Sequence, residues 1–261
     1  MALPRVIPVL LLRNKGLVKT VKFKEHKYVG DPINAVKIFN EKEVDELAFL
    51  DIDASKENRE PPYEYLKEIA SECFMPLSYG GAVRTLDQIK RLIQSGIEKV
   101  IINTEAINNP EFIKAATDAY GSSTIVGAMD VKKTLWGNYQ VYSHVKKNTV
   151  GLDPVKHAEH LQQLGVGEIF VNNVDHDGMM NGYDFTLVSK ITHAVNVPVI
   201  ACGGCGSVSD IDRVINESGA RGAAAGSFFV FHGKHRAVLI TYPEYKVLEA
   251  LFNKVGEKTL S

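Results

Sequence analysis

The chain contains one segment twice. It reads Gly80-Gly81-Ala82-Val83-Arg84-Thr85-Leu86-Asp87 at its first occurrence and Gly203-Gly204-Cys205-Gly206-Ser207-Val208-Ser209-Asp210 at its second, almost half the chain length later. The glycine pair and the aspartate occupy equal positions in both copies, and Ser-Gly follows at 95–96 and 218–219. A repeat of this length indicates two similar halves, each with a Gly-Gly turn that leads into a helix. Because N–H groups at a helix N-terminus bind anions, we expect two similar anion sites facing one cavity.

Eight short apolar runs alternate with amphipathic segments along the chain. The runs are continuous and mostly apolar, as expected of parallel strands buried on both faces. They cover residues 6–12, 47–51, 75–79, 99–103, 124–130, 168–172, 199–202 and 222–226. Helices are expected to begin at Asp31-Pro32, Thr85, Asn109-Pro110, Asp153-Pro154 and Ser207, and to cover 183–195 and 242–255.

This alternation predicts an α/β fold of the (β/α)8 TIM-barrel type. We expect a single domain over 1–261, made of half-barrels of about 1–120 and 121–261. A doubly wound open sheet is the alternative, but it would call for G-x-G-x-x-G after the first strand, and the sequence has none there.

Composition limits the class of function. The 261 residues carry a formal net charge of -1, and the basic residues are dispersed, which argues against nucleic-acid binding. Three cysteines, no secretory signal and no long apolar run predict a cytoplasmic protein that crosses no membrane. Cys202 and Cys205 have a C-x-x-C spacing that could serve redox chemistry or a metal, or could reflect small residues at a strand end. His157 and His160 fit a solvated helix face better than a metal site, so we expect no metal and no cofactor.

The residues that follow the predicted strands point to phosphate binding. In a barrel of this kind the site lies at the carboxyl ends of the strands. Glycine lets backbone N–H groups approach an anion, and hydroxyl groups add further donors. The alternative is that the glycines only form tight turns, but two copies, each with a hydroxyl one strand later, favour two phosphate sites and a ligand with a phosphate at each end. The two sets are Gly81, Ala82, Asn103 and Thr104, and Gly203, Gly204, Gly226 and Ser227.

Asp130, at the end of the fifth run, is the candidate for acid–base catalysis. It could instead be paired for structural reasons with Lys132 or another base. The repeat aligns Asp130 with Leu11, so the two equivalent positions cannot both supply a carboxylate. Lys19, Asp51 and Asp177 are expected on the same face. The roles of His232, His235 and Arg236 after the last run are left open.

These motifs resemble the cyclase subunit of imidazole glycerol phosphate synthase, the HisF family. The resemblance runs almost end to end and implies the barrel fold and a lyase-type synthase subunit of histidine biosynthesis. It is carried by Gly30-Asp31-Pro32, 45–52, Gly80-Gly81 with Arg84, 100–103, Gly151-Leu152-Asp153, 175–178 with Gly182-Tyr183-Asp184, and 195–204.

The family resemblance implies a route for ammonia. Family members receive ammonia from a HisH-like glutaminase subunit docked on the amino-terminal face of the barrel, within a glutamine amidotransferase complex. The channel entrance is a ring of four charged residues, which here corresponds to Arg5, Glu46, Lys99 and Glu168. Two positive and two negative side chains suggest a closed ring of salt bridges that could open for a small polar molecule.

The family's catalytic pair is incomplete in this chain. The substrate of the family carries two phosphates, and two aspartates perform acid–base catalysis. One corresponds to Asp130 and the other falls at Leu11. Loss of a catalytic carboxylate commonly costs about 10²–10⁴ in rate, so the sequence predicts that cyclization is impaired while ammonia entry is intact.

The tail over 231–243 resembles paralogues associated with surface-polysaccharide genes. The leading hypothesis is a HisF-like subunit that passes ammonia to an acceptor, for acetamidino-sugar formation together with an N-acetyl-sugar amidotransferase. A working histidine-pathway cyclase is the second hypothesis. A third is a non-catalytic activator of the glutaminase that binds a bisphosphorylated ligand.

Overall fold

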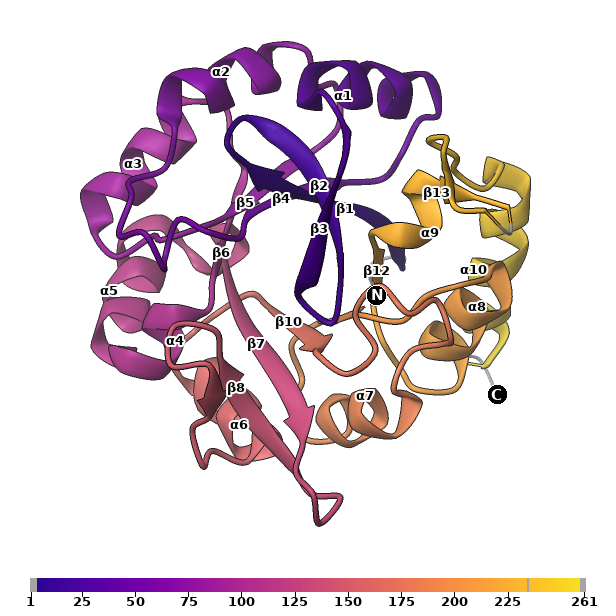
Figure 1. Ribbon diagram of the computed structural model, residues 1–261. Helices are drawn as coiled ribbons and strands as arrows, with labels where there is room; N and C mark the ends of the chain where they lie inside the picture. The colour runs from indigo at the N-terminus through magenta and orange to yellow at the C-terminus, as the bar shows by residue number, and fades with distance from the viewer. Residues whose placement is uncertain (1–3, 234, 259–261) are drawn as a thin grey trace.

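The computed structural model describes residues 4–233 and 235–258, and eight parallel strands close into a barrel within them (Figure 1). Each strand pairs with its neighbours, and the barrel closes because β12 pairs with β1 in register from Arg5 opposite Gly222 to Pro8 opposite Ala225. The barrel strands are β1 (Arg5–Arg13), β4 (Leu47–Asp51), β5 (Leu77–Gly80), β6 (Lys99–Ile102), β7 (Ile125–Lys133), β10 (Glu168–Asn173), β11 (Val199–Cys202) and β12 (Gly222–Ala225). The predicted (β/α)8 fold is confirmed, and the open sheet is excluded.

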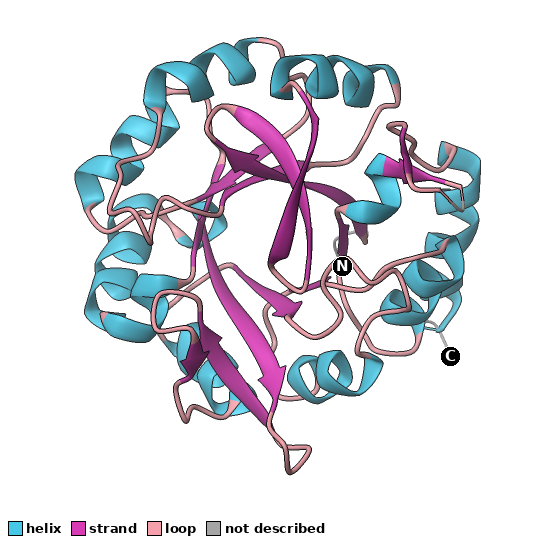
Figure 2. Cartoon of the chain, viewed as in Figure 1, coloured by secondary structure: helices cyan, strands magenta, loops and turns pink. Residues whose placement is uncertain are grey.

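Helices form a ring around the barrel (Figure 2). Several begin where the sequence places a capping side chain: Asp31 and Asp153 accept hydrogen bonds of 2.9 Å from the backbone of Asn34 and Val155, and Thr85 forms a capping box with Gln88. The helices are α1 (Pro32–Glu41), α2 (Tyr63–Ser71), α3 (Leu86–Gln94), α4 (Thr104–Asn108), α5 (Pro110–Tyr120), α6 (Pro154–Gln163), α7 (Phe185–Thr192), α8 (Val208–Asn216), α9 (Ser227–Val230) and α10 (Tyr245–Lys258), with a 3₁₀ turn, η1 (Ser122–Thr124). Helices α2, α4 and α9 were not among the expected helices.

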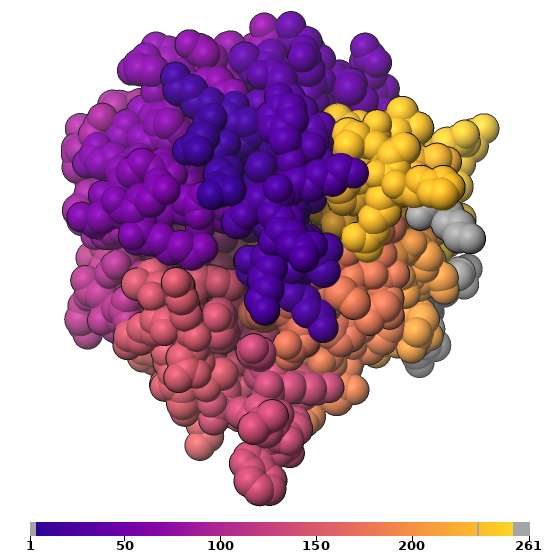
Figure 3. Space-filling view, in the orientation of Figure 1, coloured from indigo at the N-terminus to yellow at the C-terminus, as the bar shows by residue number. Residues whose placement is uncertain are grey.

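Two strands run beyond the barrel and carry antiparallel additions. Strand β1 continues into β2 (Gly16–Val21) and β3 (Lys24–Gly30), and β7 continues into β8 (Tyr139–Ser143) and β9 (Asn148–Thr149). A further short pair is β13 (Phe231–His232) with β14 (Ala237–Val238). Figure 3 shows the first addition, in indigo, lying across the centre of the face seen in Figure 1. Lys19 lies on β2 within this addition.

The core has two layers because alternate strand residues face opposite sides. In β4, Leu47 and Phe49 pack toward the helices, whereas Ala48 faces the barrel interior. The interior is filled by apolar side chains, so it is a packed core and not an open pore. The interior set comprises Ile7, Val9, Leu11, Val18, Ala48, Ile101, Val126, Ala128, Phe170, Ile200 and Ala224. None of the helices in the described part of the chain has the length and apolar character needed to cross a membrane.

Candidate functional site

One cavity opens at the carboxyl ends of the barrel strands, and it brings the predicted site residues together. Both copies of the Gly-Gly segment line it, as do residues that follow the other strands. The predicted residues in its lining are Gly81, Ala82, Asn103, Thr104, Asp130, Gly203, Gly204, Gly226, Ser227, Lys19, Asp51, Asp177 and Leu11. Residues from both halves of the chain thus share one site.

Local backbone conformation and close packing require glycine at two positions of the repeat. Gly204 has a φ of 108°, and a Cβ at this position would lie 2.1 Å from the carbonyl oxygen of Gly182. A Cβ on Gly81 would lie 2.7 Å from the Tyr79 hydroxyl. Tight packing therefore explains these two glycines without a ligand, and phosphate binding at the two turns stays a prediction.

Asp130 is buried in the site, and its two carboxylate oxygens accept hydrogen bonds from residues at the ends of β6 and β10. Asn172 Nδ2 donates to Oδ1 at 2.7 Å, and Asn103 Nδ2 donates to Oδ2 at 2.6 Å. His144 Nε2 lies 3.3 Å from Oδ2. Burial raises the pKa of Asp130, but the charge of a protonated His144 and the two amide donors outweigh it, so the pKa is lowered overall. Asp130 is therefore held as a carboxylate.

Lys19 lies across the same cavity. Its ammonium donates to the carbonyl oxygen of Val9 at 2.6 Å. Burial lowers the pKa of Lys19 to about 8, against the opposing effects of Asp177 and Cys202. Burial also raises the pKa of Asp177, whose carboxylate accepts a hydrogen bond of 3.0 Å from the Thr20 hydroxyl. These groups join the hairpin of β2 and β3 to the loop after β10.

The carboxylate of Asp51 is engaged in hydrogen bonds with residues of the loop after β4. Two guanidinium nitrogens of Arg59 donate to its two oxygens, each at 3.2 Å, and the backbone N–H of Ala54 donates to Oδ1 at 3.1 Å. A carboxylate engaged in this way organises the loop after β4 and has little capacity left for proton exchange.

Leu11 lies where the repeat would place the second carboxylate. It pairs in register with Leu50 and Val18 and packs within the apolar barrel interior. Its side chain lines the cavity but carries no group that exchanges protons.

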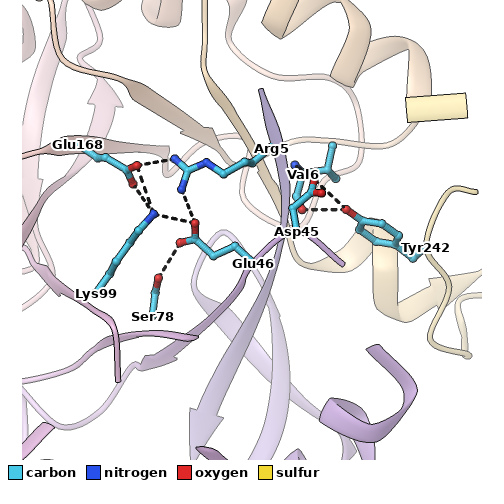
Figure 4. A network of polar contacts seen from close by, with 8 residues as sticks. All are labelled: Arg5, Val6, Asp45, Glu46, Ser78, Lys99, Glu168 and Tyr242. Carbon is cyan, nitrogen blue, oxygen red and sulfur yellow. Dashed lines mark hydrogen bonds and ion pairs between the residues drawn. The ribbon is translucent and has the colours of Figure 1, made fainter. Parts of the chain in front are cut away.

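A ring of charges closes the opposite end of the barrel (Figure 4). Arg5, Lys99 and Glu168 begin β1, β6 and β10, and Glu46 directly precedes β4. Arg5 pairs with Glu46 and, at 2.5 Å, with Glu168, while Lys99 pairs with the same two carboxylates at 2.8 and 3.2 Å. The structure thus brings all four predicted residues into one closed network. Their use as an ammonia entrance stays a prediction.

The remaining sulfur and imidazole groups give no metal site among the described residues. Cys202 and Cys205 are free thiols, and burial raises the pKa of both. Burial likewise lowers the pKa of His157 to about 4, so this helix histidine is neutral at pH 7. Neither pair gathers further metal ligands in the part of the chain described.

The tail over 231–243 contacts the loop after β10 through Arg236. Arg236 donates from Nη2 to the carbonyl oxygen of Gly178 at 2.9 Å, which ties the tail to the loop after β10. His232 and His235 are exposed, and Lys234 lies outside the described residues.

Sequence reasoning missed three residues of this site: His144, Asn172 and Arg59. His144 follows β8, which the apolar runs did not reveal because only alternate residues of that strand are buried. Asn172 was treated only as the end of a strand. Contacts of this kind join residues that are distant in sequence, so no local pattern points to them.

Comparisons with known proteins identify the family. Residues 5–236 match the family described as histidine biosynthesis protein. The chain belongs to the HisF family within it. A provisionally named imidazole glycerol phosphate synthase subunit of Pseudomonas aeruginosa, hisF2, is 52% identical over 245 residues, which cover 94% of this chain and 98% of the relative.

Two further relatives support this membership in the HisF family. The Vibrio vulnificus relative, also provisionally named as such a subunit, hisF3, is 50% identical over 92% of each chain. The HisF subunit of imidazole glycerol phosphate synthase from Alkaliphilus metalliredigens is 40% identical over 87% of this chain and 90% of the relative.

Proposed function

We propose that this HisF-like chain receives ammonia from a HisH-like glutaminase at the amino-terminal face of the barrel and delivers it at the opposite mouth. The observation that carries the proposal is the coexistence of a complete charged ring with Leu11 in the site. The ring couples four side chains at the starts of four barrel strands, whereas the position aligned with Asp130 has no acid–base group. The chain therefore has the four residues of the proposed ammonia entrance but lacks the second catalytic carboxylate.

The acceptor that we propose is an acetamido sugar, converted to an acetamidino sugar in surface-polysaccharide biosynthesis. The tail over 231–243 supports this assignment because it resembles paralogues associated with such genes. Two relatives also carry numbered names, hisF2 and hisF3, which fit additional copies of a subunit. The sugar would be presented by an N-acetyl-sugar amidotransferase at the barrel mouth.

The proposal is tested with ammonium and the histidine-pathway ribonucleotide as substrates. The purified chain is expected to turn over at least about 100-fold more slowly than a HisF enzyme, because one general acid–base group is missing. The HisF subunit from Alkaliphilus metalliredigens serves as the matched control. Turnover by both proteins at comparable rates would overturn the proposal and favour a working histidine-pathway cyclase.

A working cyclase is the second candidate, and the cavity itself favours it. Asp130 and both Gly-Gly turns face one cavity, as a substrate with two phosphates would need. In that case bisphosphate ligands should bind, and replacement of Leu11 by aspartate should change the rate little.

A further inference from the structure

Asp130 is poorly suited to be the group that gives and takes protons in this site. Both of its oxygens already accept hydrogen bonds, from Asn172 at 2.7 Å and Asn103 at 2.6 Å. Its lowered pKa keeps it ionised near pH 7. An anion that is permanently charged and fully hydrogen-bonded can orient and stabilise a neighbouring cation, but it is a weak acid and a weak base.

His144 is the neighbour that such an anion would serve. Its Nε2 lies 3.3 Å from Asp130 Oδ2, but this buried nitrogen has no aligned hydrogen-bond partner among the described residues. The ring is held on two sides, by Phe23 with ring centroids 4.1 Å apart and by Tyr142 at 4.9 Å. The imidazole is therefore fixed in position at the cavity while its capacity to exchange protons is unused.

A second polar group without a full set of partners contacts the other carboxylate oxygen of Asp130. Asn172 is nine-tenths buried and lines the cavity, and its Oδ1 accepts no hydrogen bond within residues 4–233 and 235–258. A buried acceptor without a donor costs free energy unless a ligand supplies one. Ammonia has three N–H groups and one lone pair, so it fits a site with one open acceptor and one imidazole.

We infer that His144 and Asn172 receive ammonia at the barrel mouth, and that His144 is the catalytic acid–base group in place of the missing carboxylate. The inference rests on the proposed function, in which ammonia arrives through the barrel. Asn172 Oδ1 accepts one N–H, and the nitrogen lone pair is directed to the carbonyl carbon of the acceptor. Asp130 is a positioning residue that holds the imidazole and stabilises its protonated form.

The proposed step balances without a redox partner. The nitrogen lone pair forms the N–C bond as the carbonyl π electrons move to oxygen, and the His144 imidazole carries one proton from the nitrogen to that oxygen, which gives a neutral carbinolamine. His144 then carries a second proton from the nitrogen to the hydroxyl group, which leaves as water while C=N forms. The products are an imine or amidine and one water molecule for each ammonia consumed.

The test uses the purified full-length chain, added to an extract of its own host from which the gene has been deleted. Glutamine labelled with ¹⁵N in its amide group is the probe, glutamate release reports the glutaminase, and mass spectrometry follows ¹⁵N into acetamidino sugars. His144→Ala and His144→Gln are expected to lower ¹⁵N transfer about 100-fold with unchanged glutamate release. His160→Ala, which removes an exposed histidine of α6, should behave as wild type.

A purely structural role for His144 predicts that His144→Gln keeps its activity, because glutamine can place an N–H group beside Asp130 even though it cannot exchange a proton at neutral pH. Acid–base catalysis by His144 predicts instead that both variants lose ¹⁵N transfer, and that added imidazole restores His144→Ala but not His144→Gln. Transfer by His144→Gln within about threefold of wild type, or absence of imidazole rescue, would overturn the inference and leave the proposed function standing. If the wild-type chain itself restores no ¹⁵N transfer, the proposed function fails and this inference fails with it.

Discussion

Replacement of Glu46 by glutamine tests whether the charged ring acts as one unit. Glu46 is 2% exposed, and its carboxylate accepts from Arg5, Lys99 and, at 2.7 Å, the Ser78 hydroxyl. Glutamine has nearly the same shape and keeps an oxygen for Ser78. The change therefore removes one negative charge and leaves two cations to share Glu168.

The expected cost follows from the burial of the partners. Loss of one member of a buried ion pair destabilises a protein by about 3–5 kcal/mol. The side chains of Arg5 and Lys99 are 23% and 16% exposed, so water relieves part of the imbalance and the lower end, about 3 kcal/mol, applies. For a chain of this size that corresponds to a fall in Tm of about 6–12 °C.

Thermal unfolding followed by circular dichroism measures this effect. Glu98→Gln is the matched control, because Glu98 is exposed next to Lys99 and should leave Tm unchanged. The double variant Glu46→Gln/Lys99→Met restores charge balance and should recover at least half of the loss. A Tm for Glu46→Gln within about 2 °C of wild type would refute the view that the ring is a coupled, buried network.

Three further outcomes follow from the site. Leu11→Asp should raise turnover of the histidine-pathway ribonucleotide with ammonium about 100-fold, and an unchanged rate would favour a chain that is already a working histidine-pathway cyclase. Lys19 has a pKa of about 8 when folded and 10.5 when unfolded, so its buried charge destabilises the fold below pH 8 and stops doing so as pH rises toward 10.5. Denaturant titrations should show wild type gaining about 3 kcal/mol relative to Lys19→Met across that range, and a pH-independent difference would contradict the assignment. Gly204→Ala should lower the free energy of unfolding by about 3 kcal/mol, because the new Cβ would meet the Gly182 carbonyl oxygen. Gly121→Ala is the control: Gly121 also has a positive φ, of 84°, but open space around it, so the loss should be about 1 kcal/mol. Equal losses of stability in the two variants would be inconsistent with the clash.

The sequence predicted the barrel because its signals are local. Each apolar run is long enough to define a buried strand, and capping residues such as Asp31, Thr85 and Asp153 mark helix starts within one turn. Strand ends were less accurate: β1 and β7 continue to Arg13 and Lys133, beyond the expected ends. These extensions are stabilised by antiparallel partners, which the apolar pattern of one strand cannot reveal.

The candidate site was predicted in part. The repeat placed both Gly-Gly turns at one cavity and singled out Asp130 and Leu11. It did not reveal that Asp51 is engaged by Arg59, or that His144 faces Asp130 from β8–β9. Pairings of this kind depend on how loops from different strands meet.

The sequence by itself therefore determined the eight-unit architecture, the two-fold repeat and the absence of a carboxylate at position 11. Periodicity and residue identity are properties of the chain alone, so no contact is needed to establish them. Only the tertiary structure decided which polar and charged side chains are engaged in hydrogen bonds and ion pairs. It engages Asp130 with Asn103 and Asn172 and, among the described residues, leaves His144 Nε2 3.3 Å from Asp130 without an aligned hydrogen-bond partner. The capacity of a side chain for proton exchange depends on its burial and its partners, which the fold brings from distant parts of the chain.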